Sequence, residues 1–159
     1  MNLQSALTLA QRAIAMLEGA QPLAQLAARL YVAQAFFLSG LTKLRDWNIT
    51  LALFQDEYQV PLLPPAVAAV AGTAGELVLP VLLALGLAGR FAAAGLSVVN
   101  VVAVVSLTEI AAPALQQHVF WGSLLLGLLL WGPGRWSLDR FVLPWLQRPT
   151  PSPAYTRAA

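Results

Sequence analysis

The stretch that decides the fold is Val67–Leu87, VAAVAGTAGELVLPVLLALGL, an apolar run with a single carboxylate, Glu76, near its middle. A run of about 20 mostly apolar residues is long enough to cross the hydrocarbon core of a bilayer as a helix. Glu76 is then expected near the midplane, where such residues normally face a partner or a wet cavity. Pro80, one turn later, lacks the amide hydrogen that would bond the carbonyl of Glu76. This turn therefore carries a side-chain acceptor and a backbone acceptor that both need partners.

The composition of the whole chain is typical of an integral membrane protein. Of the 159 residues, 58% are hydrophobic and 10% are charged, and the mean hydropathy is +0.70, which leaves too few polar residues to cover a water-soluble globule. The net charge of +2, without a basic cluster among aromatics, argues against nucleic-acid binding. The absence of cysteine excludes disulfides and thiol chemistry, and the single histidine argues against a histidine-rich metal site.

The hydropathy pattern predicts an all-α fold, an integral membrane bundle of four transmembrane helices with interfacial amphipathic helices. The transmembrane domain is expected over residues 23–134. Its expected spans are about 23–44, 66–88, 90–108 and 117–132. Between the first two spans, Trp47, Leu51, Phe54 and Tyr58 repeat on one face, which predicts a short surface helix capped by Asp46.

The two ends of the chain are expected to lie outside the bundle. In residues 1–22 the apolar side chains recur at helical spacing and the polar side chains fall on other faces of the helix. This pattern predicts an interfacial helix that ends at Gly19 and Pro22. Residues 135–148 predict a second interfacial helix, with Ser137 as its cap, and 149–159, rich in Pro, Ser and Thr, predict a disordered tail.

The distribution of basic residues predicts the orientation. Seven of the nine Lys and Arg side chains fall on one side of the expected spans, and only Lys43 and Arg45 fall on the other. This places both termini in the cytoplasm. Residues 1–22 show no basic segment followed by a compact apolar core, so no signal peptide is expected, and the first span would be its own targeting signal.

Helix geometry assigns approximate depths to the polar residues of the spans. At about 1.5 Å per residue, Gln34, Glu76 and Asn100 lie roughly 13–18 Å from the cytoplasmic boundary, and Lys43 and His118 lie roughly 24–27 Å from it. Trp121, one turn inward from His118, falls near the level of Glu76. Polar or aromatic groups from four helices are therefore expected to meet in the outer half of the bundle.

Each of these residues has a structural interpretation beside the functional one. Glu76 is either a carboxylate that holds the bundle together, protonated or paired with Lys43 or Asn100, or an acid that handles protons or a ligand. His118 is a proton or hydrogen-bond partner of a ligand, or an interfacial histidine without a chemical role. Lys43, and more so Arg29, could extend to the headgroups. Gln34 and Asn100 most often hydrogen-bond between helices.

Short motifs occur in a consistent order along these segments. They are Arg29–Tyr31, Phe36–Phe37, Ser39–Leu44, Tyr58–Pro61, Gly72–Leu77, Leu79–Pro80, His118, Trp121–Gly122, Gly132–Arg135 and Ser137–Asp139. Together they resemble the DoxX family of small four-helix membrane proteins, over roughly residues 26–142. The resemblance implies a bacterial-type inner-membrane bundle associated with membrane oxidoreductase systems, some of which reduce quinones. A thiol mechanism does not carry over, and no haem or flavin motif is present, so no intrinsic cofactor is expected.

The leading hypothesis is a subunit that binds a quinone or another lipidic molecule in its outer half and supports a partner oxidoreductase. Glu76 would exchange a proton, His118 and Lys43 would hydrogen-bond carbonyl oxygens, and Trp121 would stack on the ring. Asn100, Gln34 and Arg29 are further candidates for ligand contact. The alternatives are a non-enzymatic scaffold, whose polar core only stabilises the bundle, and a small proton-coupled transporter. Expected partners are the bilayer, the oxidoreductase subunit and a second copy of the chain.

Overall fold

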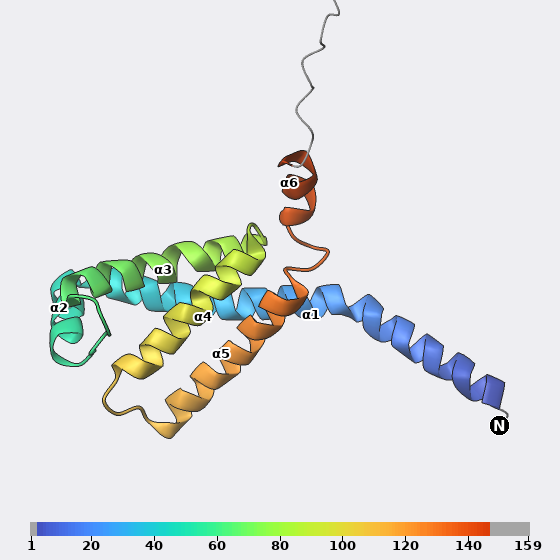
Figure 1. The fold of residues 1–159 in the computed structure, drawn as a ribbon, viewed down its shortest axis with the longest axis horizontal. Helices are drawn as coiled ribbons and strands as arrows, with labels where there is room; N and C mark the ends of the chain where they lie inside the picture. The colour runs from blue at the N-terminus through green and yellow to red at the C-terminus, as the bar shows by residue number, and fades with distance from the viewer. Residues whose placement is uncertain (1–2, 147–159) are drawn as a thin grey trace, which may run out of the picture.

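The computed structural model describes residues 3–146, and every regular element in this part of the chain is a helix (Figure 1). The helices are α1 (Leu3–Arg45), α2 (Trp47–Asp56), α3 (Pro65–Leu85), α4 (Gly89–Ser106), α5 (Ala112–Trp131) and α6 (Asp139–Leu146). The predicted all-α class is confirmed. The predicted tail at 149–159 lies outside the described residues.

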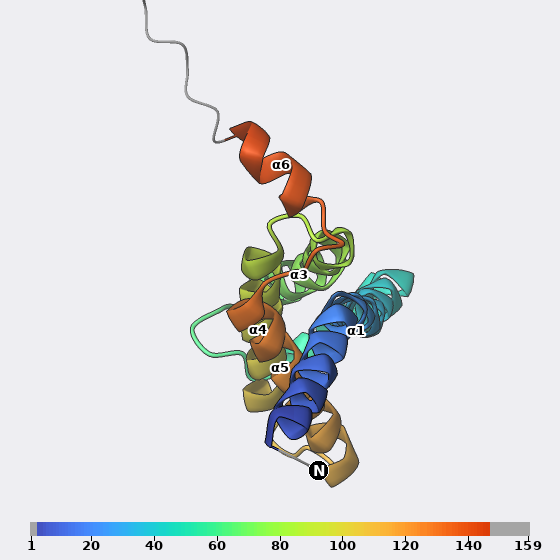
Figure 2. The ribbon, with the colours of Figure 1, turned by 90° about the vertical axis from the view of Figure 1, so that its right-hand side faces the viewer.

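Four of the described helices, α1, α3, α4 and α5, pack against one another. The second half of α1 lies against α3 and α5, α3 lies against α4, and α4 lies against α5 (Figures 1 and 2). Their shared core contains Val32, Phe36, Leu83, Leu96 and Leu125, all buried. Burial of each such side chain contributes about 1.5–3 kcal/mol where the alternative is water.

Three of the described helices, α3, α4 and α5, are long and apolar enough to cross a membrane. They correspond to the second, third and fourth expected spans. Helix α1 is longer than any of them, but Arg29, Gln34 and Lys43 interrupt the apolar residues of its second half and lower its hydropathy.

The expectation that Gly19 and Pro22 end the first helix is wrong, because α1 is continuous over 43 residues with Pro22 inside it. An internal proline removes one backbone hydrogen bond, here to the carbonyl of Glu18. The residues around Glu18 are exposed, so solvent can bond that carbonyl. The part of α1 before Pro22 projects beyond the bundle (Figure 1).

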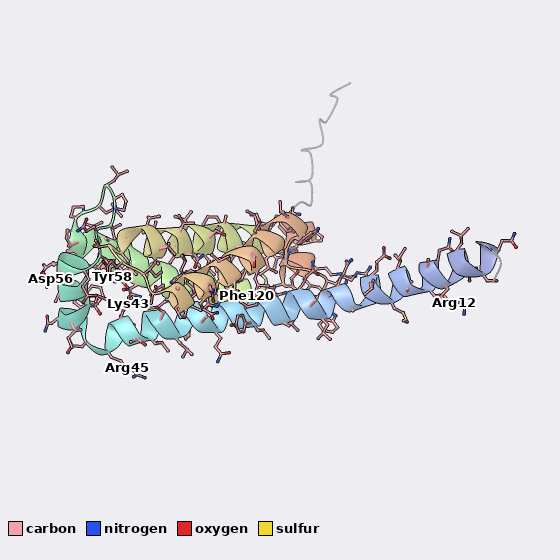
Figure 3. The ribbon with its side chains drawn as sticks, turned by 90° about the horizontal axis from the view of Figure 1, so that it is seen from below. Arg12, Lys43, Arg45, Asp56, Tyr58 and Phe120 are labelled. Atoms are coloured by element: carbon pink, nitrogen blue, oxygen red, sulfur yellow. The ribbon has the colours of Figure 1, made fainter. Side chains whose placement is uncertain are left out.

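Helix α2 closes the end of the bundle at which α1 ends. The Asp46 carboxylate accepts a hydrogen bond from the Ile49 amide at 3.0 Å, so the predicted cap is confirmed. Phe54 is buried against Ala68 and Ala69 of α3, which holds α2 across the ends of its neighbours (Figure 3). Beyond α2, the Gln59 amide donates to the carbonyl of Ser106 at 2.8 Å and ties the connecting loop to α4.

At the opposite end, the segment that follows α5 folds back over the turn between α3 and α4. Gly86 ends α3 in the left-handed conformation, with φ of 66°. The Asp139 carboxylate accepts hydrogen bonds from the amides of Ala88 and Gly89 at 2.7 and 2.8 Å, so it caps α4. Ser137, expected to cap the last helix, instead donates its hydroxyl to the carbonyl of Gly134 at 2.7 Å.

Candidate functional site

The predicted acid, Glu76, forms an ion pair with Lys43. The ammonium of Lys43 lies 2.8 and 2.6 Å from the two carboxylate oxygens of Glu76 and donates to the hydroxyl of Ser39 at 3.1 Å. The two side chains are 15% and 10% exposed. The pairing of Glu76 with Lys43, one of the alternatives that the sequence left open, is therefore the observed arrangement, and it supplies the partner that a carboxylate between helices needs.

A close approach of α1 and α3 makes this pair possible. Gly40 lies one turn before Lys43, and a Cβ atom there would lie 2.9 Å from the side chain of Leu77 and 3.1 Å from the Cβ of Glu76. A larger residue at position 40 would require Leu77 or the helix itself to shift. The hydroxyl of Thr50 in α2 donates to the carbonyl of Lys43 at 2.7 Å, which fixes the end of α1.

A cavity of about 190 Å³ lies beside the ion pair, between α2, α3, α4 and the loop after α2. Lys43 and Glu76 line it together with Tyr58 and Ser106. The rest of its wall is apolar and comes mainly from Phe54, Val60, Leu63, Ala68, Ala71, Val98, Val99, Val102 and Ala103. A pocket with an apolar wall and a few convergent polar groups is the usual form of a small-molecule site.

Two polar groups of this cavity have unused hydrogen-bonding capacity. Ser106 is 1% exposed, and its hydroxyl has no hydrogen-bond partner among the described residues. Tyr58 packs its ring against Phe54, with the centroids 5.0 Å apart. Burial, followed by the negative charges of Glu76 and Glu57, raises the pKa of the Tyr58 phenol. Its hydroxyl therefore stays protonated at neutral pH and can donate a hydrogen bond.

His118, Asn100 and Trp121 form a second polar cluster, between α4 and α5. The Asn100 amide donates to the carbonyl of His118 at 2.9 Å, and its oxygen lies 2.8 Å from Nδ1 of His118. The ring of His118 meets the ring of Trp121 edge to face at 5.2 Å. None of these three residues lines the 190 Å³ cavity. The sequence placed them in one site with Glu76 and Lys43, whereas the structure places them at a different helix interface.

Arg29 lies at the end of the bundle opposite α2 and is buried, with 1% exposure. Its guanidinium donates four hydrogen bonds to backbone carbonyls. The acceptors are Leu83 at 2.9 Å, Ala84 at 2.6 Å, Pro133 at 2.7 Å and Trp136 at 2.8 Å. The expectation that Arg29 extends to the headgroups is wrong, because the segment after α5 covers it. Gln34 faces the outside of the bundle, in a shallow groove beside Phe37 and Pro80.

Sequence reasoning identified Lys43 and Glu76 but missed Tyr58 and Ser106. The helical pattern places Tyr58 on the face of a surface helix, and nothing in the sequence singles out Ser106. A signal was present for Tyr58, since Tyr58–Pro61 is one of the motifs, but no spacing rule shows that a loop folds back over a span. Among residues 3–146, no group of three or more His, Asp or Glu side chains could hold a metal ion.

The family model described as DoxX matches residues 24–109, which is more than half of the chain. The chain belongs to the DoxX family. The match begins before Arg29 and ends after α4, so it includes every residue that lines the cavity beside Glu76. The His118 cluster combines Asn100, inside the match, with two residues outside it. No curated protein and no solved structure matches this DoxX chain.

Proposed function

We propose that this DoxX protein binds the ring of a quinone, or of another lipidic molecule, in the cavity beside Glu76. It would act as a subunit of a membrane oxidoreductase system. The observation that carries the proposal is a cavity wall that is apolar except for one group of polar side chains: the Lys43–Glu76 pair, Tyr58 and the unpartnered hydroxyl of Ser106. A buried hydroxyl without a partner is uncommon in folded proteins and is satisfied when a ligand accepts its hydrogen.

The size of the cavity favours a small ring. Its volume of about 190 Å³ is below the roughly 300–1,000 Å³ of pockets for drug-sized ligands, so a ligand would place one ring inside and its chain outside. Val98 lines the cavity and is itself 62% exposed on the outer face of α4. An apolar chain could therefore leave along α4 toward the bilayer.

The polar groups suit the chemistry of a quinone. Reduction of a quinone to a quinol takes up two electrons and two protons. In this proposal a partner subunit supplies the electrons, and Tyr58 and Ser106 donate hydrogen bonds to a carbonyl oxygen. Glu76 passes one proton to that oxygen, and water supplies the second proton to the other carbonyl oxygen. Lys43, whose three donors bond Ser39 and Glu76, balances the charge of the carboxylate. The hydrogen-bonding role expected for His118 moves to Tyr58 and Ser106, which line the cavity, and Trp121 has no part in this proposal.

The membrane arrangement belongs to the same proposal. The second half of α1 would cross the bilayer beside α3 as a fourth span, with its cations satisfied by Glu76 and by backbone carbonyls. Both termini would lie in the cytoplasm of a bacterial-type cell, and α2 would lie at the outer surface, as the count of basic residues indicates.

A cavity-filling substitution tests the proposal without touching the ion pair. Val102 lines the cavity, whereas its neighbour Val101 is 57% exposed on the outside of α4. We expect Val102→Phe to reduce the quinone retained by the purified protein at least about tenfold, because its ring occupies the ligand's volume, and Val101→Phe to leave it unchanged. Mass spectrometry of extracted small molecules measures the amount per protein.

Two results would overturn this proposal. One is equal quinone content in both variants and in the wild type. The other is the absence of any ring compound from the wild type prepared in mild detergent, which would favour a scaffold whose ion pair only joins α1 to α3. The same measurement on Glu76→Gln and His118→Gln shows which polar cluster holds the ligand. In this proposal Glu76→Gln loses retained quinone and His118→Gln does not.

A further inference from the structure

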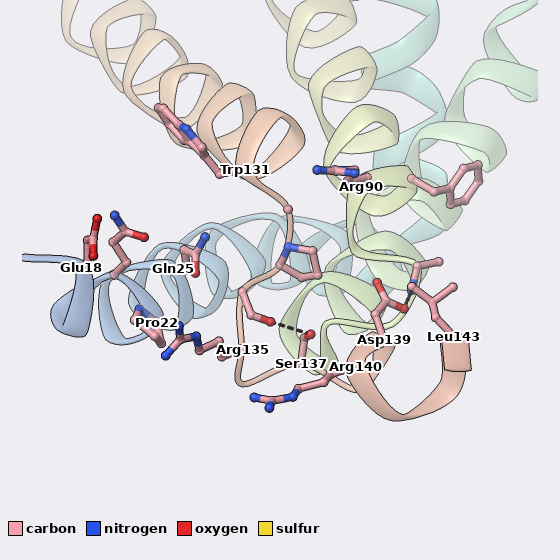
Figure 4. A pocket seen from close by; sticks show the side chains of 16 residues that line it. Glu18, Pro22, Gln25, Arg90, Trp131, Arg135, Ser137, Asp139, Arg140 and Leu143 are labelled. Atoms are coloured by element: carbon pink, nitrogen blue, oxygen red, sulfur yellow. Dashed lines mark hydrogen bonds between the residues drawn. The ribbon is translucent and has the colours of Figure 1, made fainter. Parts of the chain in front are cut away.

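A wide groove of about 920 Å³ lies at the inner end of the bundle, opposite α2, and has no part in the proposed quinone site (Figure 4). Its wall comes from α1, from the start of α4, and from the chain between the end of α5 and α6. Arg90, Arg135 and Arg140 contribute three guanidinium groups from three different segments.

The groove also holds two carboxylates, Asp139 and Glu18, and among the described residues neither forms an ion pair with these three arginines. Asp139 directs both carboxylate oxygens to the amides of Ala88 and Gly89. Glu18 lies on the α1 side of the groove in Figure 4, and it forms no ion pair among the described residues. Within the part of the chain that the structure describes, the side chains of Arg135 and Arg140 have no hydrogen bond or ion pair, and Arg90 has one hydrogen bond, to the carbonyl of Leu130 at 3.2 Å.

Apolar side chains border the same groove. Phe91 and Trp131 line it and are 67% and 76% exposed, and they stand at the ends of α4 and α5, which continue into the proposed membrane spans. Leu143 of α6 lines it from the other side and is 48% exposed. The groove thus presents cations beside apolar surface that leads toward the bilayer, which is the pattern of a site for a lipid rather than for a soluble anion.

We propose that this groove binds the headgroup of an anionic phospholipid. The guanidinium groups of Arg135 and Arg140 would donate paired hydrogen bonds to the phosphate oxygens, as the planar fork of arginine allows. The acyl chains would lie along Phe91 and Trp131. A bound lipid would also bridge α4, the chain after α5 and α6, and would stabilise this end of the protein by mass action.

The test compares full-length protein in nanodiscs or detergent with phosphatidylglycerol, phosphatidylcholine or inorganic phosphate added. The variant Arg135→Gln/Arg140→Gln removes the two cations, and Arg12→Gln/Arg45→Gln removes the same charge away from the groove. The readouts are the lipids bound per protein by native mass spectrometry and the lipid-dependent shift of the thermal unfolding temperature. Since the two arginines are exposed and unpaired, their loss should leave the lipid-free unfolding temperature unchanged.

We expect phosphatidylglycerol to stabilise the wild type and the Arg12/Arg45 variant, and phosphatidylcholine and phosphate to have little effect. In the Arg135/Arg140 variant the affinity for phosphatidylglycerol should fall about thirtyfold, since each basic side chain near an anionic lipid contributes about 1 kcal/mol. Equal phosphatidylglycerol binding by all three proteins would overturn the proposal and leave the arginines as orientation signals alone. An equal response to inorganic phosphate would also overturn it, in favour of a soluble anion.

Discussion

Two cations of the same helix show how side-chain chemistry selects a partner. Arg29 and Lys43 both lie in the second half of α1. The guanidinium of Arg29 has five donors in a planar fork and bonds four backbone carbonyls, two at the end of α3 and two after α5. The ammonium of Lys43 is a compact charge, and it pairs with the one carboxylate within reach, Glu76. The hydrogen bonds of Arg29 join α1 to α3 and to the segment after α5. The Lys43–Glu76 ion pair instead lies at the edge of the cavity.

Arg29→Met should lower the stability of the protein more than any loss of an exposed arginine. The substitution leaves the carbonyls of Ala84, Pro133 and Trp136 without a donor, whereas the carbonyl of Leu83 keeps the Gly86 amide. Each buried acceptor that loses its partner costs about 1–3 kcal/mol, so we expect a loss of about 3 kcal/mol or more. Thermal unfolding in one detergent measures the change. Arg12→Met, on the exposed part of α1, is the control. Similar unfolding temperatures for the two variants would contradict the role assigned to Arg29.

At the scale of single residues, the sequence predicted the unusual ones but not their surroundings. Glu76 stood out because a carboxylate is rare in an apolar run, and Lys43 was among the partners considered. The burial of Arg29 could not be predicted, since it depends on a segment about 100 positions later in the chain that folds back over it. The unpartnered hydroxyl of Ser106 is likewise visible only once the loop after α2 is in place.

At the scale of helices, proline and glycine decided where most elements begin and end. Helix α3 starts at Pro65 and ends at Leu85, with Gly86 as its C-cap, and α4 starts at Gly89, within a few residues of the expected spans 66–88 and 90–108. Helix α5 starts at Ala112, five residues before the expected start at 117, because Pro113 fits the first turn of a helix. At Pro22 the rule that proline ends a helix gives the wrong boundary, because the exposed first half of α1 tolerates an internal proline.

The contact between α1 and α3 depends on Gly40, and a matched pair of substitutions tests this. Gly40→Ala should destabilise the protein by about 1–3 kcal/mol, because its Cβ would lie 2.9 Å from the Leu77 side chain, so that Leu77 or the helices must shift. Gly19→Ala meets nothing within 4 Å and should be neutral or stabilise α1 by up to about 1 kcal/mol. Thermal unfolding of both variants provides the comparison. A neutral Gly40→Ala would show that the helices are not held at this distance.

At the scale of the whole molecule, the rotation of each helix about its axis decides which polar residues meet, more than their depth in the bundle does. Rise per residue placed Glu76, Lys43, His118 and Trp121 at neighbouring levels, yet depth says nothing about rotation about the helix axis. In the structure, α3 turns Glu76 toward α1, and α4 turns Asn100 toward His118 of α5. Two polar clusters form at two interfaces where a single site was expected.

The family match and the cavity coincide along the chain. Every side chain that lines the cavity lies within residues 24–109, whereas Arg135 and Arg140 of the groove opposite α2 and His118 of the second cluster lie beyond this range. The cavity is thus the candidate site contained in the part of the chain that defines the DoxX family. The groove combines residues inside the match, such as Arg90 and Phe91, with residues outside it, such as Arg135 and Arg140.

The most direct measurement for the central claim is photolabelling of the membrane-embedded protein with an azido-quinone, followed by peptide mapping. The cavity wall predicts labelled peptides that contain Phe54–Leu63 and Val98–Ser106, loss of the label when unlabelled quinone competes, and loss of the label in Val102→Phe but not in Val101→Phe. Labels that concentrate on α5 around His118 and Trp121, or that spread over the lipid-facing side chains and persist in Val102→Phe, would contradict the assignment of the quinone to this cavity.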